Sequence, residues 1–255
     1  MGQIYFPEIK FGEKDIFQKF KEMKLLLIET STALTSVALA EDGKIVFYKD
    51  DEAGRNQSAL TAPFIKEALD SQGLKASGLD AVCVSMGPGS YTGLRVGVSS
   101  AKGLCFGANI PLLAVGTLDC LVWEAIGSGK TQGCKYIVPM IDARRMEVYT
   151  AVFTPDGQCT TEVAPSIIDE NSFSDILADA AAAGQKVLFI GDAAEKCSKV
   201  ITSPAAVFAQ QNPTARGLLA PATKKFEASE FENVAYFEPF YLKDFVATVS
   251  RKKLF

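Results

Sequence analysis

The segment Glu29-Thr30-Ser31-Thr32 combines a carboxylate with three hydroxyl groups directly after a predicted strand. A carboxylate beside hydroxyls can contact Mg²⁺ and phosphate, so Glu29 and Thr30 are candidate nucleotide contacts. The segment contains no glycine that would let backbone N–H groups close on a phosphate. A strand end whose hydroxyls satisfy their own turn is an equally good interpretation.

A second candidate site lies in the segment from Gly87 to Gly93, between a predicted strand and a predicted helix. The N-terminus of a helix carries partial positive charge and attracts anions. The candidate anion contacts here are Gly87, Gly89, Ser90 and Thr92. The segment matches neither G-x-x-x-x-G-K-[ST] nor G-x-G-x-x-G, and the capping needs of a helix explain it slightly better than a ligand does.

A third cluster of charged residues, Asp142, Arg144, Arg145 and Glu147, falls in one predicted hairpin. Such a cluster can contact a phosphate or form a solvated network of ion pairs. Surface ion pairs usually contribute about 0 to 1 kcal/mol, so composition alone favours the network. Asp142 nevertheless stays a candidate nucleotide contact.

The sequence contains no histidine. This excludes Ser-His-Asp and Cys-His nucleophile pairs, the H-E-x-x-H zinc helix and an imidazole general base. Carboxylate, lysine, tyrosine and thiolate chemistry remain open.

The elements that would position these segments are short apolar strands and amphipathic helices. Strands are predicted at residues 25–28, 36–40, 44–48, 81–85, 111–115, 136–141, 147–153 and 187–190. Helices are predicted at 58–71, ended by Gly73, at 91–106, after Thr117 as a cap, at 172–183 and near 239–243. Two α/β halves that each open with antiparallel strands predict a duplicated architecture of the actin and sugar-kinase type.

Three parts of the chain follow from this pattern. Residues 1–22 are interpreted as an N-terminal extension ahead of a start at Met23. A docking or surface helix around residues 16–23 is the alternative interpretation. Residues 23–126 and 127–255 are the predicted N-terminal and C-terminal subdomains, separated at a loop rich in glycine, serine and lysine.

The predicted helix at 91–106 is apolar nearly all round and contains three glycines, which each cost about 1 kcal/mol relative to alanine in a helix. Close approach of another backbone would explain them. With the apolar stripe of the preceding helix they form a candidate partner surface, and burial inside one larger domain is the rival interpretation. The surface comprises Leu60, Phe64, Ala68, Gly93, Leu94, Gly97, Ser100, Ala101 and Leu104. We expect Gly97→Asp to abolish partner binding and leave the fold largely intact.

Composition limits the function classes further. The chain has 255 residues, 48% of them apolar, and a net charge of −4, so it lacks an overall basic footprint for nucleic acid. It has no candidate membrane span or secretory signal, and its six cysteines are scattered without a C-x-x-C pair. These features predict a cytoplasmic protein. If it serves an RNA-modifying enzyme, a partner must supply most of the RNA contact.

Four segments resemble the TsaB (YeaZ) family in order and spacing, over about residue 23 to the C-terminus. They are Leu27 to Thr32, Gly87 to Gly97, the hairpin from Ile141 to Tyr149, and Glu238-Pro239-Phe240-Tyr241-Leu242. The G-P-G-S-Y-T-G-L-R part is shared with the catalytic paralogue TsaD, so the hairpin and the tail distinguish the two. Where the family often has a histidine before the first of the two helices, this chain has Arg55-Asn56-Gln57.

The resemblance implies an actin-like (ASKHA, ribonuclease H-like) fold and a heterodimer with TsaD through helices of the N-terminal half. It also implies that the ATPase TsaE binds the pair and that tRNA is reached indirectly through the complex. TsaD holds its metal through histidines, which this chain lacks, so the resemblance implies a non-catalytic partner subunit. It would have no catalytic residue, metal or cofactor of its own, with ATP or ADP and Mg²⁺ expected only in the complex. Whether the chain forms a homodimer alone stays open.

Two other functions remain as alternatives. The first is an autonomous ATP-dependent phosphotransferase of the same fold, which would use Glu29, Thr30, Asp142 and the Gly87–Gly93 segment. The second is the glycoprotease activity with which relatives have been labelled, which the absence of histidine disfavours most.

Overall fold

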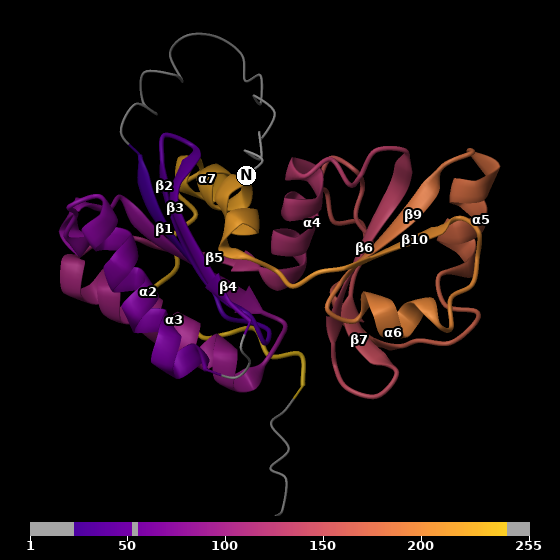
Figure 1. Cartoon of the computed structure of the whole chain (residues 1–255), viewed down its shortest axis with the longest axis horizontal. Helices are drawn as coiled ribbons and strands as arrows, with labels where there is room; N and C mark the ends of the chain where they lie inside the picture. The colour runs from indigo at the N-terminus through magenta and orange to yellow at the C-terminus, as the bar shows by residue number, and fades with distance from the viewer. Residues whose placement is uncertain (1–22, 53–55, 244–255) are drawn as a thin grey trace, which may run out of the picture.

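The computed structural model describes residues 23–52 and 56–243, which fold around two five-stranded sheets (Figure 1). The first sheet has the strand order β3-β2-β1-β4-β5. Its strands are β1 (Lys24–Glu29), β2 (Thr35–Glu41), β3 (Lys44–Asp51), β4 (Ala81–Gly87) and β5 (Leu112–Gly116). β1 pairs antiparallel with β2 and parallel with β4, and its run from Leu25 to Ile28 is fully buried, because helices or loops cover both faces of the sheet.

The second sheet repeats this topology with the order β10-β9-β6-β7-β8. Its strands are β6 (Cys134–Asp142), β7 (Glu147–Thr150), β8 (Ala164–Ile167), β9 (Lys186–Gly191) and β10 (Ala206–Gln210). As in the first sheet, the first strand in the chain, here β6, is central. The antiparallel-paired strands β7 and β8 lie on one side of it, and the parallel-paired strands β9 and β10 lie on the other. The predicted duplicated, actin-like α/β fold of two subdomains is therefore confirmed.

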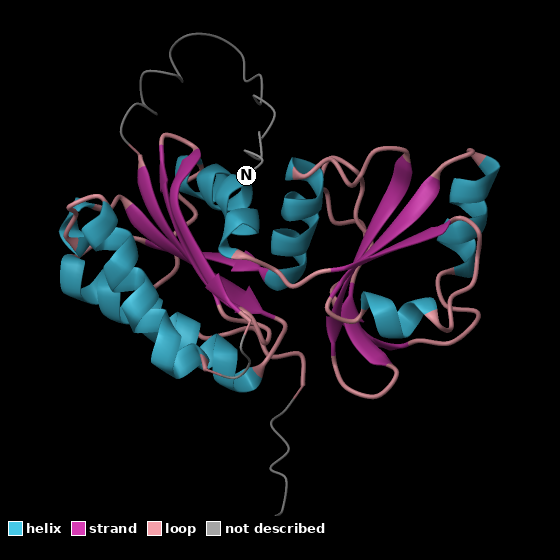
Figure 2. Cartoon of the chain, in the orientation of Figure 1, coloured by secondary structure: helices cyan, strands magenta, loops and turns pink. Residues whose placement is uncertain are grey.

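Helices cover the first sheet on both faces (Figure 2). On one face lie α2 (Gln57–Ser71) and α3 (Tyr91–Ala108), and on the other lie the 3-10 helix η2 (Ala215–Leu218) and α7 (Leu219–Glu227). A short 3-10 helix, η1 (Ala76–Gly78), follows α2, and α5 (Ser174–Ala182) and α6 (Ala194–Ser198) pack on the second sheet.

The helix α4 (Thr117–Gly127) lies between the two sheets (Figure 1). Cys120 packs with the first sheet, whereas Leu118, Leu121 and Val122 belong to a core cluster with Ile137 and other residues of the second sheet. One helix thus contributes to the cores of both subdomains. Among the described residues, no helix is long and apolar enough to cross a membrane.

The chain returns to the first sheet after the second one is complete. Ala215 and Leu218 of η2 and Ala222 of α7 pack in the core beneath β1 and β2. Residues 228–243, here called the C-terminal strap, then run back along the first subdomain. The strap makes a bridge to Leu112 and hydrogen bonds to α3 and β4. The predicted subdomain boundary at residue 126 stays a prediction, but this return gives the first sheet a share of the residues beyond it.

Several predicted elements need correction. The helix expected near residues 239–243 is absent from this described stretch, where the strap runs without helix or strand because its backbone bonds go to β4 and its side chains to α3. Thr117 is the first residue of α4, and Gly116 holds the cap position. The helix α7 was not predicted, and the amphipathic helix expected around residues 16–23 lies almost wholly outside the described residues.

Candidate functional site

The segment after β1 turns back on itself instead of opening to solvent. Glu29 is completely buried, and its Oε1 accepts a hydrogen bond from the backbone N–H of Ser31 at 2.5 Å. The side chain of Gln57, the first residue of α2, donates to the carbonyl of Thr32 at 2.8 Å. The Glu29 carboxylate and the Gln57 side chain therefore hold this turn, whereas the buried hydroxyls of Ser31 and Thr32 have no hydrogen-bond partner in the described structure. The interpretation that these hydroxyls satisfy their own turn is not supported.

The same segment packs directly against the start of α3. The hydroxyl of Thr30 donates to the carbonyl of Gly93 at 2.8 Å, and the N–H of Ser90 donates to the carbonyl of Ser31 at 2.6 Å. A Cβ atom placed on Gly93 would lie 2.0 Å from the carbonyl oxygen of Thr30, and one on Gly89 would lie 2.3 Å from that of Ser31. These glycines are required because two carbonyl groups of the chain itself occupy the space beside them.

The remaining parts of the predicted anion site have other partners. The hydroxyl of Ser90 caps α3 by accepting from the N–H of Gly93 at 3.3 Å. Gly87 has a φ of +120°, and a Cβ there would lie 2.5 Å from the carbonyl oxygen of Phe240 in the strap. Thr92 is exposed on the first turn of α3. The structure thus brings Glu29, Thr30 and the Gly87–Gly93 segment together, but as a packed junction.

Asp142 lies in a different environment from Glu29. Its carboxylate accepts hydrogen bonds from the backbone N–H of Arg144 at 2.9 Å and from the Lys196 ammonium group of α6. Its own N–H donates to Asp192 at 2.8 Å, where burial raises the pKa of the Asp192 carboxyl to about 6. All of these partners belong to the second subdomain, so the structure shows no joint site for Asp142 and Glu29.

The buried carboxyl of Glu29 has no basic side chain bonded to it among the described residues. Burial raises its pKa, and the hydrogen bond from the Ser31 N–H and the nearby hydroxyls of Ser31 and Ser85 oppose that rise. Its Oε2 has no hydrogen-bond partner in the structure. Within the described ranges, no group of three or more cysteine, aspartate and glutamate side chains is arranged to hold a metal ion. A carboxyl group this enclosed fits a structural role better than a Mg²⁺ ligand, which keeps bound water around it.

The candidate partner surface on α2 and α3 divides into buried and accessible residues. Phe64, Ala68, Leu94 and Ala101 are at most 5% exposed, and Gly93 and Gly97 are also buried inside the subunit. Leu60, Ser100 and Leu104 are half-buried and reachable. A Cβ on Gly97 would lie 2.3 Å from the Thr30 hydroxyl, so the structure argues against the expectation that Gly97→Asp would leave the fold largely intact.

An apolar groove of about 470 Å³ lies between the outer faces of α2 and α3. Its lining residues include Ile65 and Leu69 from α2 and Ser99, Gly103 and Leu104 from α3. One turn further along α3 from Gly103, Phe106 is 85% exposed. The accessible stripe of α3 is therefore Arg95, Ser99, Gly103 and Phe106, one turn apart each, and the sequence interpretation chose mostly the opposite, inward face. A helical wheel of residues 91–106, drawn with Gly93 and Gly97 on the side that faces the Glu29-Thr30 segment, would have identified this accessible stripe.

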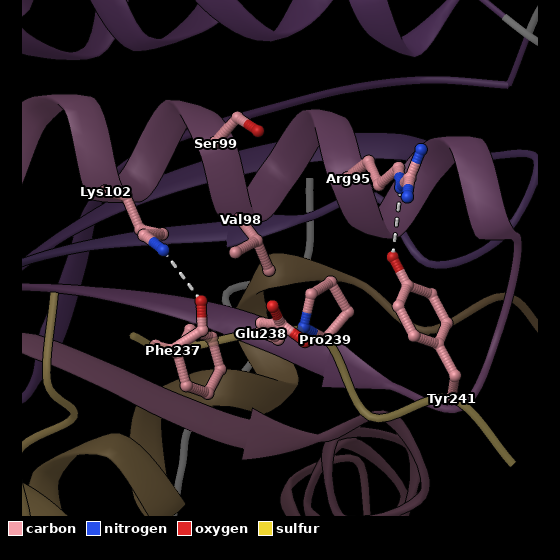
Figure 3. Close-up of a pocket in the computed structure, with 8 residues that line it drawn as sticks. All are labelled: Arg95, Val98, Ser99, Lys102, Phe237, Glu238, Pro239 and Tyr241. Atoms are coloured by element: carbon pink, nitrogen blue, oxygen red, sulfur yellow. Dashed lines mark hydrogen bonds between the residues drawn. The ribbon is translucent and has the colours of Figure 1, made fainter. Parts of the chain in front are cut away.

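On its other side, α3 borders a second hollow of about 450 Å³ against the strap (Figure 3). Lys102 donates to the carbonyl of Phe237 at 2.8 Å, and Arg95 donates to the hydroxyl of Tyr241 at 3.3 Å. Tyr241 also packs on Tyr91, with the ring centroids 5.1 Å apart. The strap is thus fastened to α3 at two points, and exposed aromatic side chains continue along it at Tyr236 and Phe240.

Comparison with known proteins gives a consistent family. The family model described as "TsaD: tRNA N6-adenosine threonylcarbamoyltransferase" matches residues 50–250. The tRNA threonylcarbamoyladenosine biosynthesis protein TsaB of Escherichia coli K12 is 28% identical over 231 residues, which cover 88% of this chain and 96% of that protein. TsaB of Bacillus subtilis is 31% identical over 170 residues, which cover 66% of this chain and 71% of that protein.

Solved structures agree with the sequence comparison. YeaZ from Pseudomonas aeruginosa has a TM-score of 0.74 and 26% identity to this chain, and the match covers 86% of this chain and 100% of that one. The matching length, the identity to the relatives and the duplicated fold lead to one conclusion: the chain belongs to the TsaB (YeaZ) family.

Proposed function

We propose that this chain is a non-catalytic partner subunit of a TsaD-type threonylcarbamoyltransferase in the formation of threonylcarbamoyladenosine on tRNA. The observation that carries the proposal is the apolar groove between α2 and α3, together with the exposed Phe106 one turn along α3 from Gly103 of the groove. A large exposed aromatic side chain next to an apolar hollow is typical of a protein–protein interface.

Gly103 adds a second reason to place the interface there. A Cβ on Gly103 would meet no atom within 4 Å, so the subunit itself does not need a glycine at this position. Glycine in a helix interior costs about 1 kcal/mol relative to alanine. Close approach of a partner helix over the groove supplies the reason that the isolated chain lacks.

The junction at Glu29 supports a role without catalysis by this chain. The carbonyls of Thr30 and Ser31 lie where a phosphate would have to approach Gly93 and Gly89. Asp142, the other expected nucleotide contact, is bonded within its own hairpin and to α6. ATP or ADP, Mg²⁺ and the ATPase TsaE therefore belong, in this proposal, to the assembled complex in the cytoplasm. The complex, rather than this chain alone, provides most of the contact with tRNA.

Size-exclusion chromatography with light scattering tests the proposal. The full chain is mixed with TsaD from the same organism, with and without TsaE and ATP. A stable one-to-one complex is the expected result, and a mixture that elutes as two separate proteins would reject the partner role. The chain alone reports whether the same groove supports a homodimer when TsaD is missing.

The alternative function, an autonomous ATP-dependent phosphotransferase, makes a different prediction. Tight ATP binding by the isolated chain, measured by titration calorimetry, would favour it, because the nucleotide would then need no second subunit. We expect no such binding, since the carbonyls of Thr30 and Ser31 fill the space at the start of α3. A glycoprotease would cleave a protein substrate as the pure chain, and we expect no cleavage.

A further inference from the structure

The turn between β6 and β7 holds two consecutive arginines in an unfavourable backbone conformation. Arg144 has a φ of 72° and Arg145 a φ of 51°, both in the left-handed region. Hairpin turns of this kind strongly favour asparagine and glycine, because a side chain larger than these crowds the backbone. The sequence therefore has two large cationic side chains at a turn whose geometry favours asparagine or glycine.

Lys196 of α6 fixes the backbone of this turn through several hydrogen bonds. The ammonium group of Lys196 donates to the carbonyls of Arg145 and Glu147, each at 2.8 Å, and also to the carboxylate of Asp142. The N–H of Ala143 donates to the carbonyl of Glu147 at 3.1 Å and closes the hairpin. The two arginines thus project from a fixed frame.

The acidic neighbours of the arginines are already paired with lysines from other elements. Asp142 pairs with Lys196, and Glu147 pairs with Lys243 of the strap. Within residues 23–52 and 56–243, the guanidinium groups of Arg144 and Arg145 have no hydrogen-bond or ion-pair partner, and both residues are exposed. Two positive charges therefore remain without compensation at the tip of the hairpin.

The strap connects this tip to another basic residue. Tyr241 accepts a hydrogen bond from Arg95 of α3, and two residues later Lys243 pairs with Glu147. Figure 1 shows the lower end of α3, the strap and the β6–β7 turn along the same side of the molecule. The hairpin and the start of α3 thus form one edge with exposed cations, in a chain whose net charge is −4.

We propose that Arg144 and Arg145 are a direct contact site for RNA backbone phosphates on this subunit. A guanidinium group donates two parallel hydrogen bonds to phosphate oxygens, and a rigid turn reduces the entropy lost when it binds. The choice of RNA as the polyanion rests on the proposed function. The site itself rests on the unpaired arginines and their frame.

The test measures the binding of a fluorescently labelled, unmodified tRNA substrate by anisotropy, with the isolated full chain and with its complex with TsaD. The variant Arg144→Gly with Arg145→Gly removes both charges and suits the positive φ values, so it should fold at least as well as the parent. Loss of two phosphate contacts should lower the slope of log affinity against log salt by about 1.5, which weakens binding about 30-fold at 0.1 M salt.

Two control variants sharpen the test. Arg144→Lys with Arg145→Lys keeps the charges and should keep the salt slope. Lys44→Gln with Lys75→Gln removes two exposed charges from the first subdomain and should bind tRNA like the parent. Unchanged tRNA affinity and salt slope in the glycine variant would overturn the inference.

The outcomes also separate this inference from the proposed function. If the glycine variant keeps its tRNA affinity but no longer assembles with TsaD, the arginines bind an acidic protein surface and the RNA assignment is overturned. If the parent chain fails to assemble with TsaD at all, the partner role fails, and the isolated chain still decides the arginine contact.

Discussion

Gly97 and Gly103 lie on different sides of one helix, and their surroundings explain opposite responses to substitution. Gly97 faces inward, where a Cβ would lie 2.3 Å from the hydroxyl of Thr30 and 3.3 Å from Val84. Gly103 faces the groove between α2 and α3 and has open space around it. The first glycine serves the subunit itself, and the second does not.

We expect Gly97→Asp to lower the free energy of unfolding by about 3 kcal/mol or more, because it forces a charged group into a filled, buried site. Gly103→Ala should raise it by about 0.5 to 1 kcal/mol, because alanine favours the helix and meets no neighbour. Urea unfolding of both variants and the parent measures these changes. Equal midpoints for Gly97→Asp and the parent would show that α3 does not pack on the Thr30 segment as described.

Asp192 makes stability depend on pH. Burial raises the pKa of its carboxyl from an ordinary 3.8 to about 6, so the folded protein binds this proton more tightly than the unfolded chain. The stability contributed by this group is present below about pH 4, is lost as the pH rises to about 6, and changes no further above that.

Asp192→Asn should remove this loss while its side-chain oxygen still accepts the N–H of Asp142. We expect the variant to exceed the parent in free energy of unfolding by about 1 to 3 kcal/mol at pH 7 and to match it near pH 4. Thermal or urea unfolding at both pH values measures the difference. A variant that gains equally at the two pH values would contradict the raised pKa.

At the scale of elements, α3 has three distinct sides. One faces the sheet and the Thr30 segment, one faces the strap through Arg95 and Lys102, and one borders the groove with α2. Phe106 stands near the end of the helix and contributes little to the fold, since 85% of it is exposed. It is therefore a clean probe of the proposed interface.

Phe106→Lys should change the free energy of unfolding by less than about 0.5 kcal/mol, as exposed substitutions usually do. Its affinity for TsaD should fall about 30-fold, which corresponds to about 2 kcal/mol and is typical of an aromatic anchor. Isothermal titration with purified TsaD measures this. The matched control is Ile167→Lys on β8, where Ile167 is 78% exposed, and it should bind TsaD normally. Equal losses for the two variants would remove Phe106 from the interface.

At the scale of the whole molecule, α4 packs into the cores of both subdomains, so we expect them to unfold as one cooperative unit. Its buried residues pack with Ile137 and Leu188 of the second sheet, while Cys120 packs with the first. Glu124 of α4 also accepts hydrogen bonds from the N–H and hydroxyl of Thr214, just before η2 returns to the first sheet. Loosening α4 should therefore weaken both halves together.

Leu121→Ala removes a completely buried side chain from α4 and should cost about 3 kcal/mol. Trp123, the single tryptophan of the chain, reports on α4 by fluorescence, and far-UV circular dichroism reports on both sheets. The two signals should give coincident urea transitions in the parent and in the variant. Separate midpoints for the two signals would show that the subdomains unfold independently.

Sequence reasoning recovered most of the first subdomain because local signals there are strong. The buried runs of β1 and β4, the capped start of α3 at Ser90 and the repeated opening by antiparallel strands all follow from periodicity and turn chemistry. It missed α7 and misread residues 239–243 as a helix, because contacts made by the strap with distant β4 and α3 override local preference.

The sequence by itself determined the duplicated α/β fold, the family resemblance and, through the absence of histidine, the exclusion of imidazole catalysis. Only the tertiary structure decided which side of each element faces outward. Gly93 and Gly97 serve contact with Thr30, whereas Gly103 and Phe106 face the outside. It also decided that Asp142 and Glu147 are paired with lysines far away in sequence, which leaves Arg144 and Arg145 unpaired. The reason is that residue spacing fixes which side chains share a face, while only the packing of distant segments determines what that face contacts.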